Sequence, residues 1–310
     1  MTIPDWLGQS PAQENLNSDR TRGHDLTGRP HNHFGDFLYG ITGNMAFSRM
    51  MNRYVEHTDY GTQYLNWRNN STNRYNDIWW GYDYAGQFND LYEIWDAPIM
   101  DNLGNSQLKP GDYCYEDWNG DGVIDENDLH PIKYGAQTSP VLYYGLTLDL
   151  SWKGIDLTAV FQGGAFNNVK YDWYLSTPFI YDKNGPDFFF DRWHMEDASA
   201  DPLDPRTKWV RGYLPTTSQG SNAMSLNTST SAASLHEASY IRLKSLELGY
   251  TLPKKWVQKV NASSVRVFTN AYNLLTCTGL KYLDPEHPSS GYGTTYPLIC
   301  TVNFGVNIKF

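Results

Sequence analysis

Apolar and polar residues alternate along several stretches of the chain, most clearly along residues 301–310. Every second position there is apolar, at Val302, Phe304, Val306, Ile308 and Phe310. Because successive side chains of a strand point to opposite faces, this pattern predicts one strand with an apolar and a polar face. Such a strand fits the edge of a soluble sheet. It also fits the wall of a transmembrane barrel, whose strands are apolar toward lipid and polar toward the lumen.

The same period of two predicts further strands, which gives about seven in all. They are expected at residues 20–29, 36–48, 142–152, 155–162, 239–251 and 265–276. Pro30 to His33 is expected to form a tight connection, and Lys153-Gly154 the turn of a hairpin. Between Leu243 and Leu246 the apolar phase shifts, which predicts either a bulge or an exit of the strand from the apolar layer.

The connections between these strands alternate between short and long. Long ones are expected at residues 51–138 and 167–238, and a medium one at residues 278–297. Outer-membrane barrels have this asymmetry, with short periplasmic turns and long extracellular loops, and a soluble sandwich has no reason to keep it. If the short turns are periplasmic, Phe310 lies on the periplasmic side.

One segment of the first long connection has the spacing of a calcium loop. Its oxygen-bearing side chains occupy positions 1, 3, 5, 9 and 12, with Gly122 at position 6 and the carbonyl of Val123 at position 7. The candidate ligands are Asp117, Asn119, Asp121, Val123, Asp125 and Asp128. Asp128 replaces the usual glutamate, and no flanking helices are expected. The alternative is a metal-free turn of residues 117–128, folded by its own side-chain hydrogen bonds.

Composition narrows the class of function. The chain of 310 residues has a net charge of -10, and no basic run that would neutralise nucleic-acid phosphates. No apolar run approaches the length of about 18 residues that a transmembrane helix needs. Residues 1–13 have neither the basic nor the apolar region of a signal peptide, so we expect a cytoplasmic protein or a sequence whose front is missing. The three cysteines are expected to be free, and His31 and His33 have no third metal ligand nearby.

Aromatic residues make up 15% of the chain, with 11 Trp and 23 Tyr, and they crowd the long connections. Flat rings stack on sugars and also form the girdles of membrane barrels. Candidate ligand-binding rings are Trp79, Trp80, Tyr82, Trp173 and Trp193. The alternative for each ring is packing within the loops or at the membrane rim. Motifs of hydrolases, phosphate loops and zinc proteases are missing, so we expect no enzyme.

Several stretches resemble the SusC/RagA-type TonB-linked outer-membrane transporters. They are Lys109-Pro110-Gly111-Asp112 running into 117–128, Phe161-Gln162-Gly163, Asp191-Arg192-Trp193, 238–244, 248–253, Asn270, Asn273-Leu274, Asp284-Pro285-Glu286, Tyr296-Pro297, Phe304-Gly305 and Phe310. Their order and spacing extend over residues 15 to 310. The resemblance implies an all-β fold, the C-terminal segment of a 22-stranded antiparallel transmembrane β-barrel with long extracellular loops.

The resemblance also implies a function. Members of this family import oligosaccharides or peptides across the outer membrane, powered through TonB and capped by a SusD-like surface lipoprotein. We therefore expect residues 1–310 to be part of such a transporter, without its plug domain, with residues 51–138 and 167–238 outside the cell. Calcium is the one possible cofactor. The alternative is a soluble β-rich carbohydrate-binding module with a calcium loop, which behaviour in water without detergent would reveal.

Overall fold

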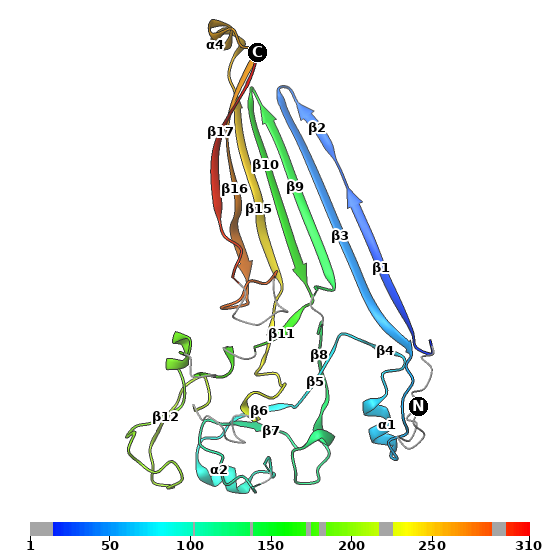
Figure 1. Ribbon diagram of the computed structural model, residues 1–310, viewed down its shortest axis with the longest axis vertical. Helices are drawn as coiled ribbons and strands as arrows, with labels where there is room; N and C mark the ends of the chain where they lie inside the picture. Colours follow the sequence, from blue (N-terminus) through cyan, green and yellow to red (C-terminus); the bar gives the residue numbers. More distant parts are fainter. Residues whose placement is uncertain are drawn as a thin grey trace, which may run out of the picture.

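The computed structural model describes residues 15–101, 103–136, 139–171, 175–179, 184–216, 226–286 and 296–310 (Figure 1). A nine-stranded antiparallel sheet dominates it. Seven strands follow one another across the sheet: β1 (Ser18–Gly28), β3 (Phe37–Tyr54), β9 (Leu142–Trp152), β10 (Ile155–Ala165), β15 (Tyr240–Thr251), β16 (Ser264–Thr278) and β17 (Thr301–Lys309). The short strands β2 (His31–Phe34) and β4 (Arg74–Tyr75) also pair with β3.

The register of the sheet gathers the apolar positions of neighbouring strands on one face. Ile41 lies opposite Leu148, Leu148 opposite Ala159, and Ala159 opposite Leu246. The adjacent residues of these strands point to the other face, which is polar. There the Thr158 hydroxyl donates a hydrogen bond of 2.8 Å to Asp149. Within the described residues no second layer covers the apolar face, and Leu146, Leu248 and Val302 remain 38%, 44% and 51% exposed. The sheet is therefore amphipathic as a whole.

The strands expected at residues 142–152, 155–162, 239–251, 265–276 and 301–310 are confirmed, each within a few residues. The bulge expected between Leu243 and Leu246 is also confirmed, because Leu243 pairs with Leu275 while Ser245 pairs with Tyr272. The tight connection expected at Pro30 to His33 is wrong. His31–Phe34 continues the line of β1 as β2, and the turn lies at Gly35-Asp36. The strand expected at residues 36–48 is longer than its alternating pattern indicates. It runs to Tyr54, four residues into the connection expected at residues 51–138.

The short turns lie together at one end of the sheet. The β9–β10 turn is Lys153-Gly154, and both residues have positive φ, 48° and 89°, as the tightest hairpin turns require. The link from β15 to β16 contains α4 (Lys254–Val257), and the helical turn that follows α4 ends at Asn261, whose φ is 52°. In Figure 1 both turns, together with the carboxyl end of β17, lie at the top, and the long connections gather at the bottom.

The long connections fold into a compact layer, here called the loop cluster, comprising the described parts of residues 55–141, 166–239 and 279–300. It contains α1 (Gln63–Asn69), α2 (Leu91–Asp96) and four two-stranded sheets. These are β5 (Ile78–Gly81) with β8 (His130–Tyr134), β6 (Tyr84–Gln87) with β7 (Tyr113–Tyr115), β11 (Asn168–Lys170) with β14 (Leu235–Glu237), and β12 (His194–Met195) with β13 (Trp209–Val210). No helix among the described residues is long and apolar enough to cross a membrane.

The loop cluster has a hydrophobic core of its own, to which α2 contributes its buried face. The Asp90 side chain caps this helix by accepting a hydrogen bond of 3.0 Å from the Glu93 N–H. Residues one helical turn apart, Leu91 and Ile94, then point to the same side and are buried. They pack with Phe88, Met100, Leu108, Tyr113, Tyr115 and Ile124. The 51–138 connection is thus a folded unit, and not an irregular loop.

A buried ion-pair network ties the loop cluster to the sheet. Arg242 of β15 is only 3% exposed, and its guanidinium lies 2.7 Å from Asp284 and 3.0 Å from Glu286. Lys244 adds a second contact to Glu286, at 2.8 Å. Asp284 also accepts the Leu298 N–H at 3.0 Å, so one carboxylate joins both ends of the β16–β17 connection to β15. Removing one partner would leave a buried charge without its opposite charge.

Candidate functional site

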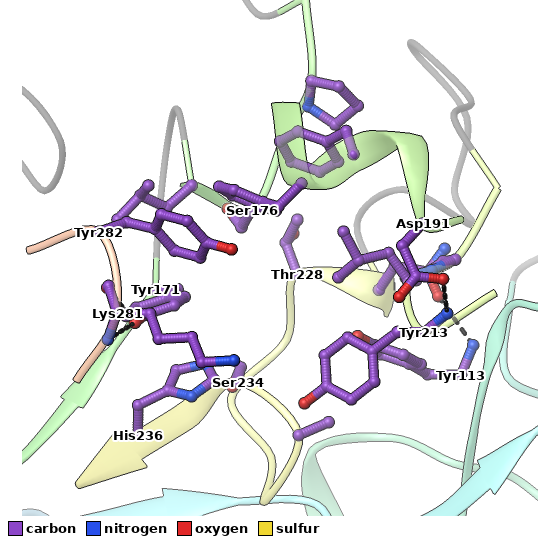
Figure 2. A pocket seen from close by; sticks show the side chains of 18 of the residues that line it. Tyr113, Tyr171, Ser176, Asp191, Tyr213, Thr228, Ser234, His236, Lys281 and Tyr282 are labelled. Atoms are coloured by element: carbon purple, nitrogen blue, oxygen red, sulfur yellow. Dashed lines mark hydrogen bonds between the residues drawn. The ribbon is translucent and has the colours of Figure 1, made fainter. Parts of the chain in front are cut away.

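A cavity of about 670 Å³ lies inside the loop cluster (Figure 2). Its wall comes from segments far apart in the sequence, namely the start of β7, residues 171, 175–179, 188–191, 213–216 and 227–236, and the start of the β16–β17 connection. The lining is rich in aromatic rings: Tyr113, Tyr171, Phe179, Phe188, Phe189, Tyr213 and Tyr282. Its volume lies in the range of cavities that hold small organic ligands.

One side of the cavity is built on the pairing of β11 with β14. Tyr171 follows β11 and stacks on His236 of β14, with ring centroids 3.7 Å apart. The Tyr171 hydroxyl donates to the carbonyl of Lys281 and accepts the Lys281 N–H at 3.0 Å. Tyr282 then stacks on Phe188 at 4.3 Å. These contacts hold the backbone of residues 281–282 at the cavity, with the Lys281 side chain directed into it (Figure 2).

Burial, aided by the positive charge of Lys133, lowers the pKa of His236 to about 4. Lys133 lies behind the strand, where its ammonium donates to the Leu235 carbonyl at 3.2 Å. His236 is therefore a neutral ring at ordinary pH, and offers hydrogen bonding and stacking without charge. The only fully charged groups on the described wall are the Lys281 ammonium and the Asp191 carboxylate.

The opposite side of the cavity carries Asp191, Tyr213 and Tyr113 (Figure 2). Asp191 accepts the Tyr213 N–H at 3.1 Å, and so holds the segment that follows β13. Behind this wall Asn227 accepts the Tyr113 N–H and donates to Asp112, both at 2.8 Å. Asp112 is completely buried, and this burial raises its pKa to about 6. The wall is thus held from behind by a hydrogen-bonded network.

Two aromatic residues of the lining have a backbone conformation that bulky side chains rarely adopt. Phe179 has φ of 60° and Tyr282 has φ of 65°, both in the left-handed region. Such conformations cost free energy, persist where the surrounding contacts fix them, and cluster at ligand sites. Their presence on two separate segments of one cavity marks it as the leading candidate for a binding site.

Four of the five aromatic residues that the sequence singled out lie elsewhere in the loop cluster. Trp79 donates to the Asn168 carbonyl at 3.1 Å, and Trp80 packs edge-on against Trp67 at 5.5 Å. Tyr82 packs against Tyr115 at 5.2 Å. Trp193 is 4% exposed, and its indole donates to Gln87 at 3.2 Å. These four rings pack within the loops and none lines the cavity. Trp173 lies outside the described residues, and ligand binding by the five stays a prediction.

The segment 117–128 folds as a tight loop closed by its own side chains. Asp117 accepts the N–H groups of Gly120 and Gly122, each at 2.7 Å. Asp128 is 1% exposed and accepts the Trp118 N–H at 2.9 Å and the Asp125 N–H at 2.8 Å. The Asp128 side chain, shorter than the glutamate usual at this position, thus closes the loop by hydrogen bonding, as in the metal-free alternative. Together with Asp125 it forms the capping box of a 3₁₀ helix (Glu126–Asp128).

The other candidate oxygens of this loop are arranged in the same way. Asn119 accepts from the Asp121 N–H at 2.8 Å, Asp121 from the Val123 N–H at 2.9 Å, and Asp125 from the Asn127 N–H at 2.6 Å. Among the described residues, no group of three or more His, Cys, Asp or Glu side chains has the geometry of a metal site. Calcium binding by residues 117–128 stays a prediction.

Sequence reasoning missed the residues that line the cavity. Tyr171 and His236 are separated by 65 positions, and only the β11–β14 pairing brings them together. Strands of three residues are too short to produce a periodic signal. The one available signal was the aromatic run Phe188-Phe189-Phe190, in which Phe188 and Phe189 do line the cavity.

Comparisons with known proteins find similarity to TonB-dependent receptors. No family model matches the chain. It is 23% identical over 99% of its length to TonB-dependent receptor P3 of Formosa agariphila, and 26% identical over 65% of its length to TonB-dependent receptor SusC of Bacteroides thetaiotaomicron. The matched parts are 30% and 18% of those two proteins, so the chain spans less than a third of either relative.

Solved structures give the same fold. The RagAB peptide transporter aligns with 100% of the chain at a TM-score of 0.65 and 21% identity, and the RagAB peptide importer in its open-open state at 0.66 and 20%. In both cases the chain covers 31% of the solved chain. At this level of identity the likeness concerns the fold: the sheet and its loop cluster correspond to part of a larger barrel protein.

Proposed function

We propose that the chain forms the C-terminal part of a 22-stranded barrel that imports nutrients. It is homologous over nearly its whole length to the SusC/RagA-type TonB-dependent receptors, which are outer-membrane transporters and not enzymes. The imported molecules are oligosaccharides or peptides. A SusD-like lipoprotein is the proposed lid over the loop cluster, and TonB the proposed source of energy.

The amphipathic sheet is the observation that carries this proposal. One face is apolar from β3 to β17 and is left exposed within the described residues, with Phe304, Val306 and Ile308 at 85%, 61% and 50%. In water such a surface would drive aggregation, whereas in a bilayer it faces lipid. The separation of short turns from long connections fits the same orientation, with turns in the periplasm and the loop cluster outside.

The cavity of the loop cluster fits the role of an external ligand site. It lies on the outer side in this orientation, between segments that a lid would cover. Its wall combines aromatic rings, hydroxyl groups and one charge of each sign. This mixture suits a polar organic ligand of the size of a few sugar units or amino acids.

The proposal is tested by expressing the full-length protein that carries this sequence and fractionating the cell envelope. We expect recovery in the outer membrane, a band that shifts on heating before electrophoresis, and a SusD-like lipoprotein in the purified material. Recovery as a soluble monomer without a band shift would reject the transporter, and would favour the soluble carbohydrate-binding module with a calcium loop.

A further inference from the structure

The cavity of the loop cluster has one positively charged group on its described wall, the Lys281 ammonium. Lys281 directs its ammonium toward the centre of the cavity (Figure 2), and none of the described carboxylates forms an ion pair with it. Its backbone, by contrast, is fixed through both N–H and C=O by the Tyr171 hydroxyl. The backbone of Lys281 is thus fixed by the fold, while its side chain is exposed and its ammonium is available to a ligand.

The second charge on the wall is already engaged in holding the fold. Asp191 accepts the Tyr213 N–H at 3.1 Å, and its carbonyl accepts the Leu214 N–H at 3.0 Å. His236 is neutral, because burial holds its pKa far below its usual range. Lys133, on the far side of β14, adds to the positive potential of the Lys281 side. The two charges of the described wall therefore lie on opposite sides of the cavity, with the positive charge on the Lys281 side and the Asp191 carboxylate on the other.

The rest of the wall is suited to flat, hydroxylated rings. Tyr213 is 71% exposed, and no described ring packs against it, so its face is open to the cavity. Tyr282 is 56% exposed and is braced from behind by Phe188 at 4.3 Å. Hydroxyl groups of Ser176, Thr228 and Ser234 lie between these rings (Figure 2). Aromatic faces with hydroxyl groups between them are a common setting for sugar rings, whose apolar faces stack on aromatics.

The backbone gives this site a rigid frame. Tyr282, next to Lys281, has φ of 65° and is held there by its stacking on Phe188. The same connection is fastened to β15 through Asp284 and Arg242, three residues further on. The ammonium and the two exposed rings are thus presented by segments that are fixed before a ligand arrives, which lowers the entropic cost of binding.

We propose that this cavity is a subsite for an acidic oligosaccharide, with the carboxylate or sulfate of one sugar unit paired to Lys281 and sugar rings stacked on Tyr213 and Tyr282. This assignment rests on the proposed transporter function, and narrows its substrate to an anionic glycan. Neutral oligosaccharides of the same length bind weakly, because the ammonium then has no partner.

Binding to the full-length protein purified in detergent tests the subsite. The probes are tetragalacturonate, a sulfated galactose tetrasaccharide, a neutral galactose tetrasaccharide and a tetrapeptide of glutamate and glycine, each titrated by calorimetry. We expect one or both acidic saccharides to bind at least about tenfold more tightly than the neutral one, the difference shrinking at high salt. The two acidic probes distinguish a carboxylate from a sulfate as the recognised group.

The Lys281→Gln variant should lose about tenfold in affinity for the acidic saccharide and leave the neutral one unchanged. Lys281→Arg should restore most of the loss. Lys208→Gln removes an exposed lysine of the same loop cluster that does not line the cavity, and should bind as the wild type does. Tyr213→Ala should weaken every saccharide, and so report stacking separately from charge.

Outer-membrane recovery and the heat-shifted band, measured for each variant, distinguish failure of the subsite proposal from failure of the proposed transporter function. If the wild type passes that test but binds acidic and neutral saccharides equally, binds none of the saccharides, or prefers the peptide, the subsite is wrong while the transporter stands. Unchanged binding by Lys281→Gln overturns it as well. Failure of the wild type to reach the outer membrane rejects the proposed function itself.

Discussion

On the apolar face of the sheet, Ile41 and Leu248 keep 36% and 44% of their surface exposed, whereas Ile94 and Leu108 in the loop cluster keep 1% each. The residue types are the same in both regions. Among the described residues no second layer covers those of the sheet, which fits lipid as their proposed partner. In the loop cluster they pack against one another, as they must in water. Apolar side chains are thus exposed in one region of the chain and buried in the other. The boundary between the two regions lies at the end of the strands where the long connections begin.

The largest effect is expected where the two regions are joined. Replacing Arg242 with Met leaves Asp284 without its cation and Glu286 with Lys244 alone, and should cost about 3–5 kcal/mol of unfolding free energy. The β16–β17 connection should then become sensitive to trypsin. Guanidinium unfolding in detergent and limited proteolysis measure both effects.

Arg206→Met is the matched control for this variant. Arg206 pairs with Asp204 at 2.6 Å, but its side chain is 90% exposed, so its removal should change little. Equal stability of the two variants would mean that the network does not join the loop cluster to the sheet.

The next effect separates the two faces of the sheet. Leu148→Lys places a charge on the apolar face, opposite Ile41 and Ala159, and should cost about 2–4 kcal/mol if that face meets lipid. Thr147→Lys places the same charge on the polar face and should be tolerated. Unfolding in lipid vesicles, followed by the heat-shifted band, measures the difference. Equal tolerance of both lysines would contradict a lipid-facing surface.

A smaller effect concerns pH and the loop cluster alone. His236 stays neutral in the fold down to about pH 4, whereas the unfolded chain binds a proton near its ordinary pKa of 6.5. The unfolded state therefore gains protons first, and the stability that His236 contributes is lost as pH falls from about 6.5 to 4. We expect about 1 kcal/mol, since the ring is only partly buried.

The variant His236→Gln should flatten this part of the pH profile of unfolding, while His57→Gln, at an exposed position, should keep the wild-type slope. Identical slopes in the wild type and His236→Gln would show that the ring is not buried against Tyr171.

The smallest effect is expected at the loop 117–128. If the sequence-based prediction holds, purified protein contains about one equivalent of calcium, and Asp121→Ala contains none. Metal analysis of both proteins tests this, with Asp101→Ala, outside the loop, as control. Equal calcium contents in the wild type and Asp121→Ala would leave the self-bonded turn as the correct interpretation.

The two regions also differ in what their sequences reveal. Alternation over ten or more residues, as in 142–152, predicts both a strand and which of its faces is apolar, and the sheet follows from it. Even the bulge near Lys244 leaves a visible change of phase. Where alternation fails, prediction fails too. Pro30 was read as the start of a turn, although proline is tolerated at an irregular position between β1 and β2.

The cavity shows the limit of such reasoning. Its residues come from segments brought together by three-residue strands, side-chain hydrogen bonds and ring contacts, such as Tyr171 with His236 and with Lys281. No local period encodes these contacts. The tryptophans that stood out in the sequence, Trp79, Trp80 and Trp193, form the packing of the loop cluster, because large rings contribute most to a small core.

The orientation of the sheet in the membrane is the central claim, and cysteine labelling in whole cells tests it most directly. Cys114, Cys277 and Cys300 are first replaced by serine, and a single cysteine is introduced at Ala198 in the loop cluster or at Lys255 among the short turns, both exposed positions. With a maleimide that cannot cross the outer membrane, we expect labelling at 198 in intact cells and at 255 only after the membrane is opened. Labelling of both positions in intact cells, or of 255 alone, would contradict a sheet that spans the outer membrane with its loop cluster outside.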